Sequence, residues 1–254
     1  VHYLFCEESE IMTIKTTINY SPNFDLKKRK KKQVKYIVLH YTGMKSEKAA
    51  IDRLSKIQSV VSTHYFIRRN GKIILMVPES YIAWHAGRSN WHGKKSLNQN
   101  SIGIEISNKG HQFGYEKFST SQIKSLIVLL KNLRKKFNIK KKNIIGHSDI
   151  AFDRKKDPGE NFPWSLLAKN KVSIWHGISK NRLIKLRKLP INNPEEIKFF
   201  NNLKKIGYLT KKLNFKNKIK LVKAFQRRFR PEIINGKIDR ENLVIAQKIG
   251  NFVN

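Results

Sequence analysis

Cysteine is almost absent from this chain of 254 residues, since Cys6 is the single one. One thiol cannot build an intramolecular disulfide framework, and it cannot supply a multi-cysteine zinc or iron–sulfur site. A metal site in this chain would therefore have to use histidine and carboxylate ligands. Long apolar runs are also missing: none approaches the roughly 18 residues of a membrane-spanning helix. The sequence thus predicts no transmembrane segment.

Acidic residues are scarce, with 18 Asp and Glu against 53 Lys and Arg, a net charge of +35. Such a charge raises the hypothesis of nucleic-acid binding. Only 13 of the basic residues are Arg, however, and base recognition depends on Arg forks and aromatic platforms. Lys, Asn and Ile also have A/T-rich codons, so genome composition offers a second explanation. We expect no specific nucleic-acid partner, although the basic surface would attract acidic envelope polymers.

The first 33 residues carry little pattern and are predicted to be an N-terminal extension. Six consecutive basic residues at 27–32 are typical of a solvated, mobile linker. Residues 1–6 are apolar but lack the charged start and long apolar centre of a signal peptide. The sequence therefore contains no convincing export signal, and Met12 is an alternative start.

Strand and helix patterns alternate through the middle of the chain. Strands are predicted at 34–40, 63–69, 72–77, 101–107 and 143–147, and helices at 46–60 and 119–137. The dipeptide Asn70-Gly71 indicates a hairpin between two of these strands. In the segment 101–107 the isoleucines occupy one face and Glu105 the other. These patterns predict an α/β catalytic domain over 34–175, with a mixed central β-sheet flanked by helices.

After residue 175 the sequence no longer shows strand patterns. A polar linker is predicted at 176–192, and residues 193–254 read as purely helical. Helices are expected at 194–206, 219–229 and 239–249. Three short helices over about 60 residues predict a small three-helix C-terminal domain.

Four polar residues stand at the ends or on the faces of apolar strands: His40, Glu105, His147 and Asp157. A polar group on a buried strand is costly unless it is paired or bound to a ligand, and strand ends in α/β sheets often host sites. Two His and one carboxylate with an open position form a catalytic zinc set. Taken singly, each residue also fits a structural role, and the spacing matches no short zinc signature.

Six motifs in order carry a family resemblance. They are IVLHYT (37–42), STHY (62–65), AWHAG (83–87), NSIGIE (100–105), GHSDIA (146–151) and RKKDPG (154–159). Over residues 34–170 they resemble the type-2 family of zinc-dependent N-acetylmuramoyl-L-alanine amidases. The resemblance is strongest to its AmiD-like branch, to which AmpD is related.

The resemblance implies a role for each matching residue. His40, His147 and Asp157 correspond to the ligands of one Zn²⁺ ion, and Glu105 corresponds to the general base that takes a proton from the zinc-bound water. Lys155 corresponds to the residue that stabilises the oxyanion. The implied reaction is hydrolysis of the amide between N-acetylmuramic acid and L-alanine in peptidoglycan or muropeptides.

Other motif residues are candidates for substrate binding. They are Tyr41, Thr42, His64, Trp84, His85 and Asn100. Trp84 and His85 are expected at the substrate groove, because a planar apolar face suits a sugar ring, although a packed Trp is the alternative. His64 fits a structural role equally well. Asp149, two residues after His147, is expected to cap or orient rather than to bind metal.

The C-terminal segment carries a resemblance of its own. The run VKAFQRRFRP (222–231), followed by Asn235-Gly236 and Asp239, resembles a three-helix peptidoglycan-binding domain in which Asp-Gly is usual. The alternative is a helical domain that only docks on the catalytic one. A non-catalytic peptidoglycan-binding protein on the same fold is the rival function, but such proteins typically lose a zinc ligand or the base. The C-terminal domain favours the cell envelope or periplasm, whereas the missing export signal leaves the cytoplasm open.

Overall fold

A computed structural model gives the structure of the protein, and it describes residues 15–253 except residue 212. The expectations for residues 1–6 and for Met12 lie outside this range. The strands are β1 (Thr16–Ile18), β2 (Phe24–Asp25), β3 (Tyr36–Tyr41), β4 (Tyr65–Ile67), β5 (Ile73–Leu75), β6 (Ile82–Ala83), β7 (Asn90–Trp91), β8 (Lys94–Lys95), β9 (Ser101–Ile106) and β10 (Ile144–Gly146). The helices are α1 (Glu47–Ser55), α2 (Thr120–Phe137), α3 (His147–Ile150), α4 (Trp164–Lys169), α5 (Lys180–Leu186), α6 (Asn193–Ile206), α7 (Phe215–Phe229) and α8 (Arg240–Phe252).

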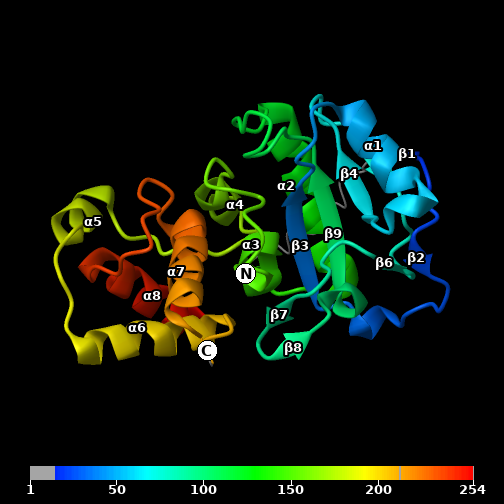
Figure 1. Cartoon of the computed structure of the whole chain (residues 1–254). Coiled ribbons are helices and arrows are strands. Elements are labelled where there is room, and N and C mark those ends of the chain that lie inside the picture. Colours follow the sequence, from blue (N-terminus) through cyan, green and yellow to red (C-terminus); the bar gives the residue numbers. More distant parts are fainter. Residues whose placement is uncertain (1–14, 212, 254) are drawn as a thin grey trace, which may run out of the picture.

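A six-stranded mixed sheet forms the centre, in the order β1-β5-β4-β9-β3-β10 (Figure 1). Strands β4, β9, β3 and β10 are parallel neighbours, whereas β5 pairs antiparallel with β4. The predicted hairpin joins β4 to β5: the Arg68 amide donates to the Lys72 carbonyl at 2.9 Å, and Gly71 has φ +84°. The predicted fold class, a mixed sheet flanked by helices, is therefore confirmed.

Helices cover both faces of the sheet. On one face, leucines of α2 pack against Ile37, Leu39 and the three isoleucines of β9. Helix α2 starts where predicted, because Ser119 and Gln122 form a capping box. On the other face, α1 packs against Phe66 of β4 and Ile74 of β5. In the described part of the chain, no helix is long and apolar enough to cross a bilayer.

The N-terminal segment is attached to the sheet rather than mobile as predicted, although five of the six basic residues at 27–32 are solvent-exposed as expected. Strand β1 adds to the sheet edge beside β5, and β2 pairs with β6. Arg29, inside the basic run 27–32, is buried. Its guanidinium donates to the carbonyl oxygens of Ser101 at 2.7 Å and Glu79 at 3.0 Å. The guanidinium has five N–H donors in a fixed geometry, so one Arg can bind several carbonyl oxygens at once. A run of like charges in the sequence does not show which residue will be buried in this way.

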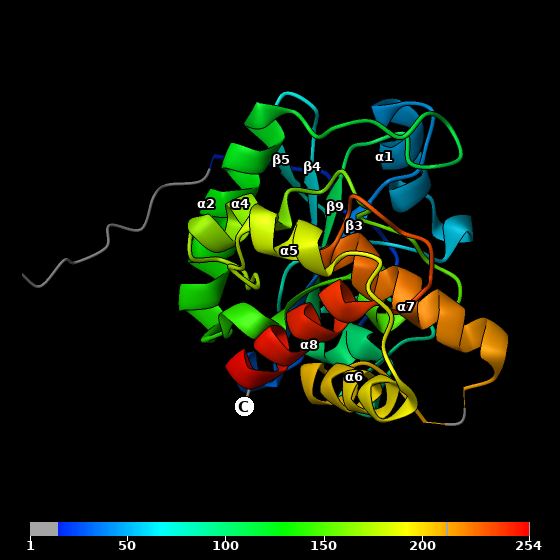
Figure 2. The same ribbon diagram turned by 90° about the vertical axis from the view of Figure 1, so that its left-hand side faces the viewer.

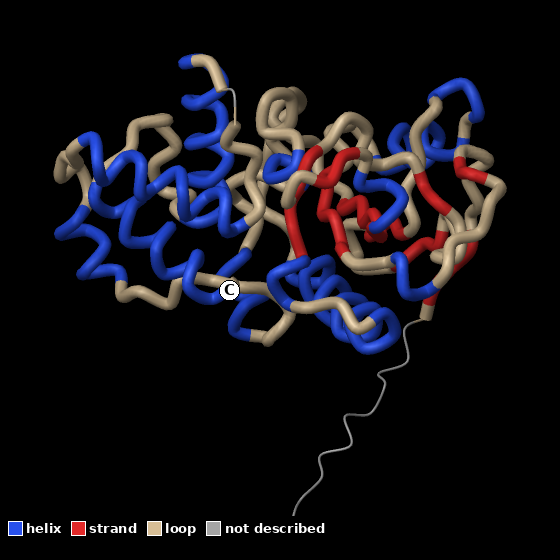
Figure 3. Tube along the Cα trace, turned by 90° about the horizontal axis from the view of Figure 1, so that it is seen from below, coloured by secondary structure: helices blue, strands red, loops and turns tan. Residues whose placement is uncertain are grey.

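The C-terminal helices pack directly on the sheet domain. Helices α6, α7 and α8 match the three that were predicted, and α5 lies inside the segment 176–192 that was expected to be a polar linker. Figure 2 shows these four helices side by side in front of the sheet, and Figure 3 shows them as one helical half beside the strands. One hydrophobic cluster joins Val38 and Ile145 of the sheet to Phe199 and Phe225 of the helices. The two parts therefore share a core.

His176 lies buried in the segment that leads into these helices. Its Nδ1 accepts a hydrogen bond from the Ile178 amide at 3.1 Å. Burial lowers the pKa of His176 to about 4, against an opposing influence of Glu232 and Glu241. Below pH 6.5 the unfolded chain takes up a proton here that the folded chain does not bind until about pH 4. The free energy of unfolding should therefore decrease as the pH is lowered through this window.

We predict that His176→Asn makes this acid-induced loss smaller. The urea midpoints of the wild type and the variant, measured at pH 7 and pH 5, test this prediction. The other buried histidines are present in both proteins and contribute equally to the loss. The wild type should therefore lose more stability between the two pH values, because only it contains His176. An equal loss in both proteins would contradict the proposed role of His176.

Candidate active site

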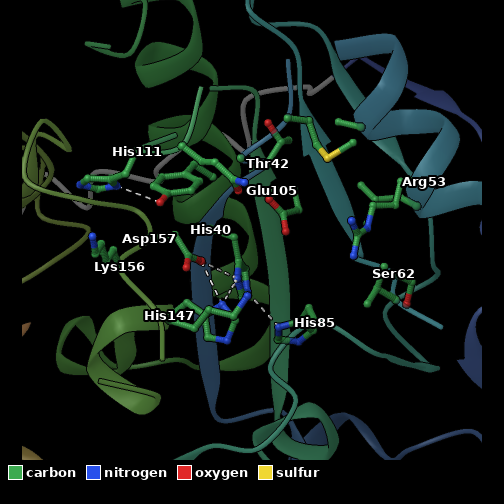
Figure 4. A pocket seen from close by; sticks show the side chains of 18 of the residues that line it. His40, Thr42, Arg53, Ser62, His85, Glu105, His111, His147, Lys156 and Asp157 are labelled. Carbon is green, nitrogen blue, oxygen red and sulfur yellow. Dashed lines mark hydrogen bonds and ion pairs between the residues drawn. The ribbon is translucent and has the colours of Figure 1, made fainter. Parts of the chain in front are cut away.

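The strand register brings three of the predicted site residues together. Strand β3 pairs with β10 so that Leu39 lies opposite Gly146, and His147 follows Gly146 as the first residue of α3. On the other side of β3, His40 lies opposite Glu105 of β9. The loop after α3 places the Asp157 side chain next to His40 and His147. Figure 4 shows His40, His147 and Asp157 directed toward one another, with Glu105 beside them on β9.

The three predicted metal ligands meet through one atom each. Nδ1 of His147 lies 2.9 Å from Nδ1 of His40 and 2.9 Å from Oδ2 of Asp157. Nδ1 of His40 lies 3.1 Å from the same carboxylate oxygen. All three side chains are buried. Two imidazole nitrogens and a carboxylate oxygen form a donor set suited to a divalent transition metal.

A chain of hydrogen bonds fixes the tautomer of His40. The Ser101 hydroxyl donates to the Leu97 carbonyl oxygen at 2.7 Å, so its oxygen accepts from Nε2–H of His85 at 3.2 Å. Nδ1 of His85 is then an acceptor and receives Nε2–H of His40 at 3.1 Å. A neutral imidazole carries one proton. Nδ1 of His40 therefore presents a lone pair to its two neighbours.

His147 is oriented in the same way by the backbone. Its Nε2 lies 3.2 Å from the Ala86 carbonyl oxygen, which can only accept, so Nε2 carries a proton, and in the neutral imidazole Nδ1 then carries a lone pair. Burial and the neighbouring His147 lower the pKa of His40 to about 4, which keeps His40 neutral.

Three lone pairs thus converge with no proton between them. Such an arrangement is repulsive unless a cation occupies the point between the three atoms. The site residues fit a bound metal ion, and each histidine has the outer hydrogen bond that orients metal-ligating imidazoles. The structure therefore brings together the His-His-Asp set that the sequence predicted.

Glu105 lies on the wall of the same cavity. Burial and the charge of Asp157 raise the pKa of Glu105 to about 8, whereas Lys155 and Arg53 oppose the increase. Its Oε2 is buried and has no hydrogen-bond partner among the described residues. A carboxyl group with a pKa near neutrality can both accept and return a proton. Its unpaired oxygen is available for a water or substrate atom.

The cavity over the site has a volume of about 440 Å³. Four basic side chains, Arg53, Arg154, Lys155 and Lys156, line it. Of these, Lys155 was predicted from the sequence as a site residue. Arg53 belongs to α1, on the side of the cavity opposite Lys156 (Figure 4). Basic walls favour anionic ligands such as carboxylates.

The six predicted substrate-binding residues divide into two groups. Tyr41, Thr42, Trp84 and His85 line the cavity. His64 is buried below it, where its Nδ1 accepts from the Gly103 amide at 2.9 Å. Asn100 precedes β9 and donates to the Gln33 carbonyl oxygen, about 16 Å along the strand from Glu105. The structure places His64 and Asn100 outside the cavity.

One cavity residue had no signal in the sequence. His111 lies in the loop between β9 and α2, where no periodic pattern marks it. Its Nδ1 lies 2.9 Å from the Tyr41 hydroxyl, and its Nε2 lies 3.1 Å from Glu160. The ring stacks on Tyr115 with centroids 4.4 Å apart. This cluster holds the Tyr41 side of the cavity wall in place.

A mixed sheet gathers two imidazoles and a carboxylate at one edge, with a second carboxylate in the same cavity, and this is an arrangement that metal-dependent hydrolases use. The sequence profile of the N-acetylmuramoyl-L-alanine amidase family (Amidase_2) matches residues 30–160. The chain belongs to this family of enzymes.

The relatives agree with this assignment. AmiD from Escherichia coli, an N-acetylmuramoyl-L-alanine amidase, is 34% identical over 230 residues, which cover 85% of this chain and 82% of AmiD. AmpD from Haemophilus influenzae, a 1,6-anhydro-N-acetylmuramyl-L-alanine amidase, is 33% identical over 162 residues, 57% of this chain and 85% of AmpD. The structure of Escherichia coli AmiD with the substrate anhydro-N-acetylmuramic acid-L-Ala-D-gamma-Glu-L-Lys matches with a TM-score of 0.75 at 32% identity, over 85% of this chain and 88% of that one. The family that the motifs predicted is confirmed.

Ser101 holds His85 as the acceptor for Nε2–H of His40. Ser101→Ala removes the oxygen that accepts Nε2–H of His85, so His85 is no longer held as an acceptor for His40. We expect metal affinity to fall roughly 10-fold or more, as for other outer partners of metal-ligating histidines. Competition with a chromophoric chelator measures the affinity.

Ser173→Ala is the matched control. Ser173 is a buried serine whose hydroxyl has no hydrogen-bond partner among the described residues. Its replacement should leave metal affinity at the wild-type value. Equal affinity in Ser101→Ala and Ser173→Ala would contradict the tautomer chain.

Proposed function

We propose that this protein is a zinc-dependent N-acetylmuramoyl-L-alanine amidase. It hydrolyses the amide between N-acetylmuramic acid and L-alanine in peptidoglycan or its muropeptide fragments. The observation that carries the proposal is the convergence of three ligand lone pairs beside the unpaired carboxyl oxygen of Glu105. The substrate named in the solved complex of the AmiD relative supports the choice of substrate class.

Zinc is the metal that suits this donor set best. Two neutral imidazoles and one carboxylate, with a fourth position open, are ligands that catalytic zinc uses. His40, His147 and Asp157 would hold the ion. Once bound, zinc would polarise the scissile carbonyl and bring the pKa of a water to roughly 7.

Glu105 and Lys155 supply the remaining groups for amide hydrolysis. Oε2 of Glu105 takes a proton as the water oxygen attacks the carbonyl carbon, and it returns the proton to the alanine nitrogen as the C–N bond breaks. Lys155 lines the same cavity, and its charge acts on both His40 and Glu105. Its ammonium group would stabilise the negative charge that develops on the carbonyl oxygen.

The C-terminal helices are proposed to bind peptidoglycan, and with them the enzyme would work in the cell envelope. The match to AmiD covers 85% of this chain, which extends beyond the family profile at 30–160. Within the motif at 222–231, Phe225, Phe229 and Arg230 are buried. The motif residues therefore hold the helices together, and any wall contact must come from the outer surface of this domain.

Incubation with purified peptidoglycan tests both the reaction and the binding. We expect the protein to sediment with the wall polymer and to release free stem peptides, identified by mass spectrometry. A chelator should stop the release, and added zinc should restore it. Sedimentation without any release, by protein shown to contain zinc, would instead support a non-catalytic binding protein on the same fold.

Two substitutions separate chemistry from metal binding. Glu105→Gln should lower turnover roughly 10²–10⁴-fold, because the proton acceptor is lost. Lys155→Met should lower kcat roughly 10²-fold, because a group that stabilises the developing charge is lost. Both proteins should keep the zinc content of the wild type, measured by elemental analysis. Full turnover in Glu105→Gln would refute its assignment as the base.

A further inference from the structure

Asp149 links the metal-ligand turn to the C-terminal helices. This residue lies in α3, two positions after His147, and its side chain is buried. Its Oδ2 accepts from the Gly146 amide at 2.7 Å. The same oxygen lies 2.5 Å from Nη1 of Arg228 in α7, and Oδ1 accepts from the Tyr208 hydroxyl at 2.6 Å. Residues from two parts of the chain thus meet on one carboxylate.

Arg228 contacts the chain on both sides of His147. Its Nη2 donates to the carbonyl oxygen of Ile144 in β10 at 2.9 Å, so the guanidinium spans the strand before His147 and the helix after it. The guanidinium carbon also lies 4.4 Å from the centroid of the Trp164 ring. Arg228 and Tyr208 are both almost fully buried. Their positions are therefore fixed by packing as well as by hydrogen bonds.

Helix α3 has little means of holding its own geometry. It has four residues, too few to be stable without outside contacts. Its N-cap is Gly146, which has no side chain, so the cap comes from Asp149 through the Gly146 amide. A buried carboxylate needs partners to remain in place, and the partners of Asp149 outside its own turn are Arg228 and Tyr208.

We propose that Arg228 and Tyr208 are positioning residues for the metal ligand His147, acting through Asp149. The C-terminal helices are then part of the scaffold of the metal centre, in addition to any wall binding. Both residues lie beyond residue 160, where the family profile ends. The proposal rests on the metal site of the proposed function, and it concerns what holds one ligand of that site.

The test compares Arg228→Met and Tyr208→Phe with Arg230→Met. Arg230 is a matched control, because it is also a buried Arg of the C-terminal domain, paired with Asp239 at 2.6 Å and Glu241 at 3.3 Å. Zinc affinity is measured on full-length protein by competition with a chromophoric chelator. Both test variants should bind zinc roughly 10–100-fold more weakly than the wild type. Arg230→Met should be less thermostable but should retain wild-type affinity.

A second readout does not depend on metal. In metal-free protein, amide hydrogen exchange over 144–150 should be faster in Tyr208→Phe and Arg228→Met, because the cap of α3 is less well held. Arg230→Met should exchange at the wild-type rate in this segment. Arg228→Lys keeps the charge but cannot bridge Asp149 and Ile144 as the fork does, so its affinity should lie between those of the wild type and Arg228→Met.

Wild-type affinity and wild-type exchange in Tyr208→Phe would overturn the proposal, even if the melting temperature falls. This variant loses one hydroxyl group, so it decides the question if Arg228→Met does not fold. A wild-type protein that binds no zinc would refute the proposed function instead. The exchange measurement on metal-free protein would still decide whether these residues hold the turn.

Discussion

The structure of the site depends on one electrostatic constraint: three lone pairs, from His40, His147 and Asp157, are held at hydrogen-bond distance with no proton to share. Their mutual repulsion has to be resisted by the surrounding protein until a cation binds. The outer hydrogen bonds supply this resistance. His85, held by Ser101, fixes the proton on the far side of His40, and the Ala86 carbonyl oxygen fixes that of His147. The parallel register of β10, β3 and β9 fixes the backbone positions from which the rings project.

Sequence patterns located the site residues that strands position, and the family resemblance supplied their expected roles. His40 and His147 end buried apolar runs, and parallel strands deliver their ends to one edge of a sheet. The hairpin at Asn70-Gly71 and the start of α2 follow from local backbone chemistry. By contrast, the place of Arg29 depends on carbonyl groups of distant loops, and a short helix with one buried leucine, α5, has too little pattern to be distinguished from a linker.

The cavity wall was predictable in part for the same reason. Tyr41 and Thr42 extend β3 and Trp84 follows β6, so their positions come with the sheet. His111 reaches the cavity through contacts with Tyr41 and Glu160, which lie far from it in the sequence. Arg227 of α7 then approaches Glu160 at 3.5 Å. Tertiary contacts of this kind leave no periodic signal, so they appear only once the chain is folded.

Two residues of the short helix α3, His147 and Asp149, contact different parts of the protein. In an α-helix successive residues are about 100° apart, so residues two positions apart point in nearly opposite directions. His147 therefore faces His40 and Asp157 when Asp149 faces the C-terminal helices, and the carboxylate of the candidate metal site comes from Asp157, beyond the helix. The prediction that Asp149 caps or orients rather than binds metal is consistent with its bond to the Gly146 amide. The same geometry makes the position of His147 sensitive to Arg228 and Tyr208, because a rotation of α3 moves both of its faces together.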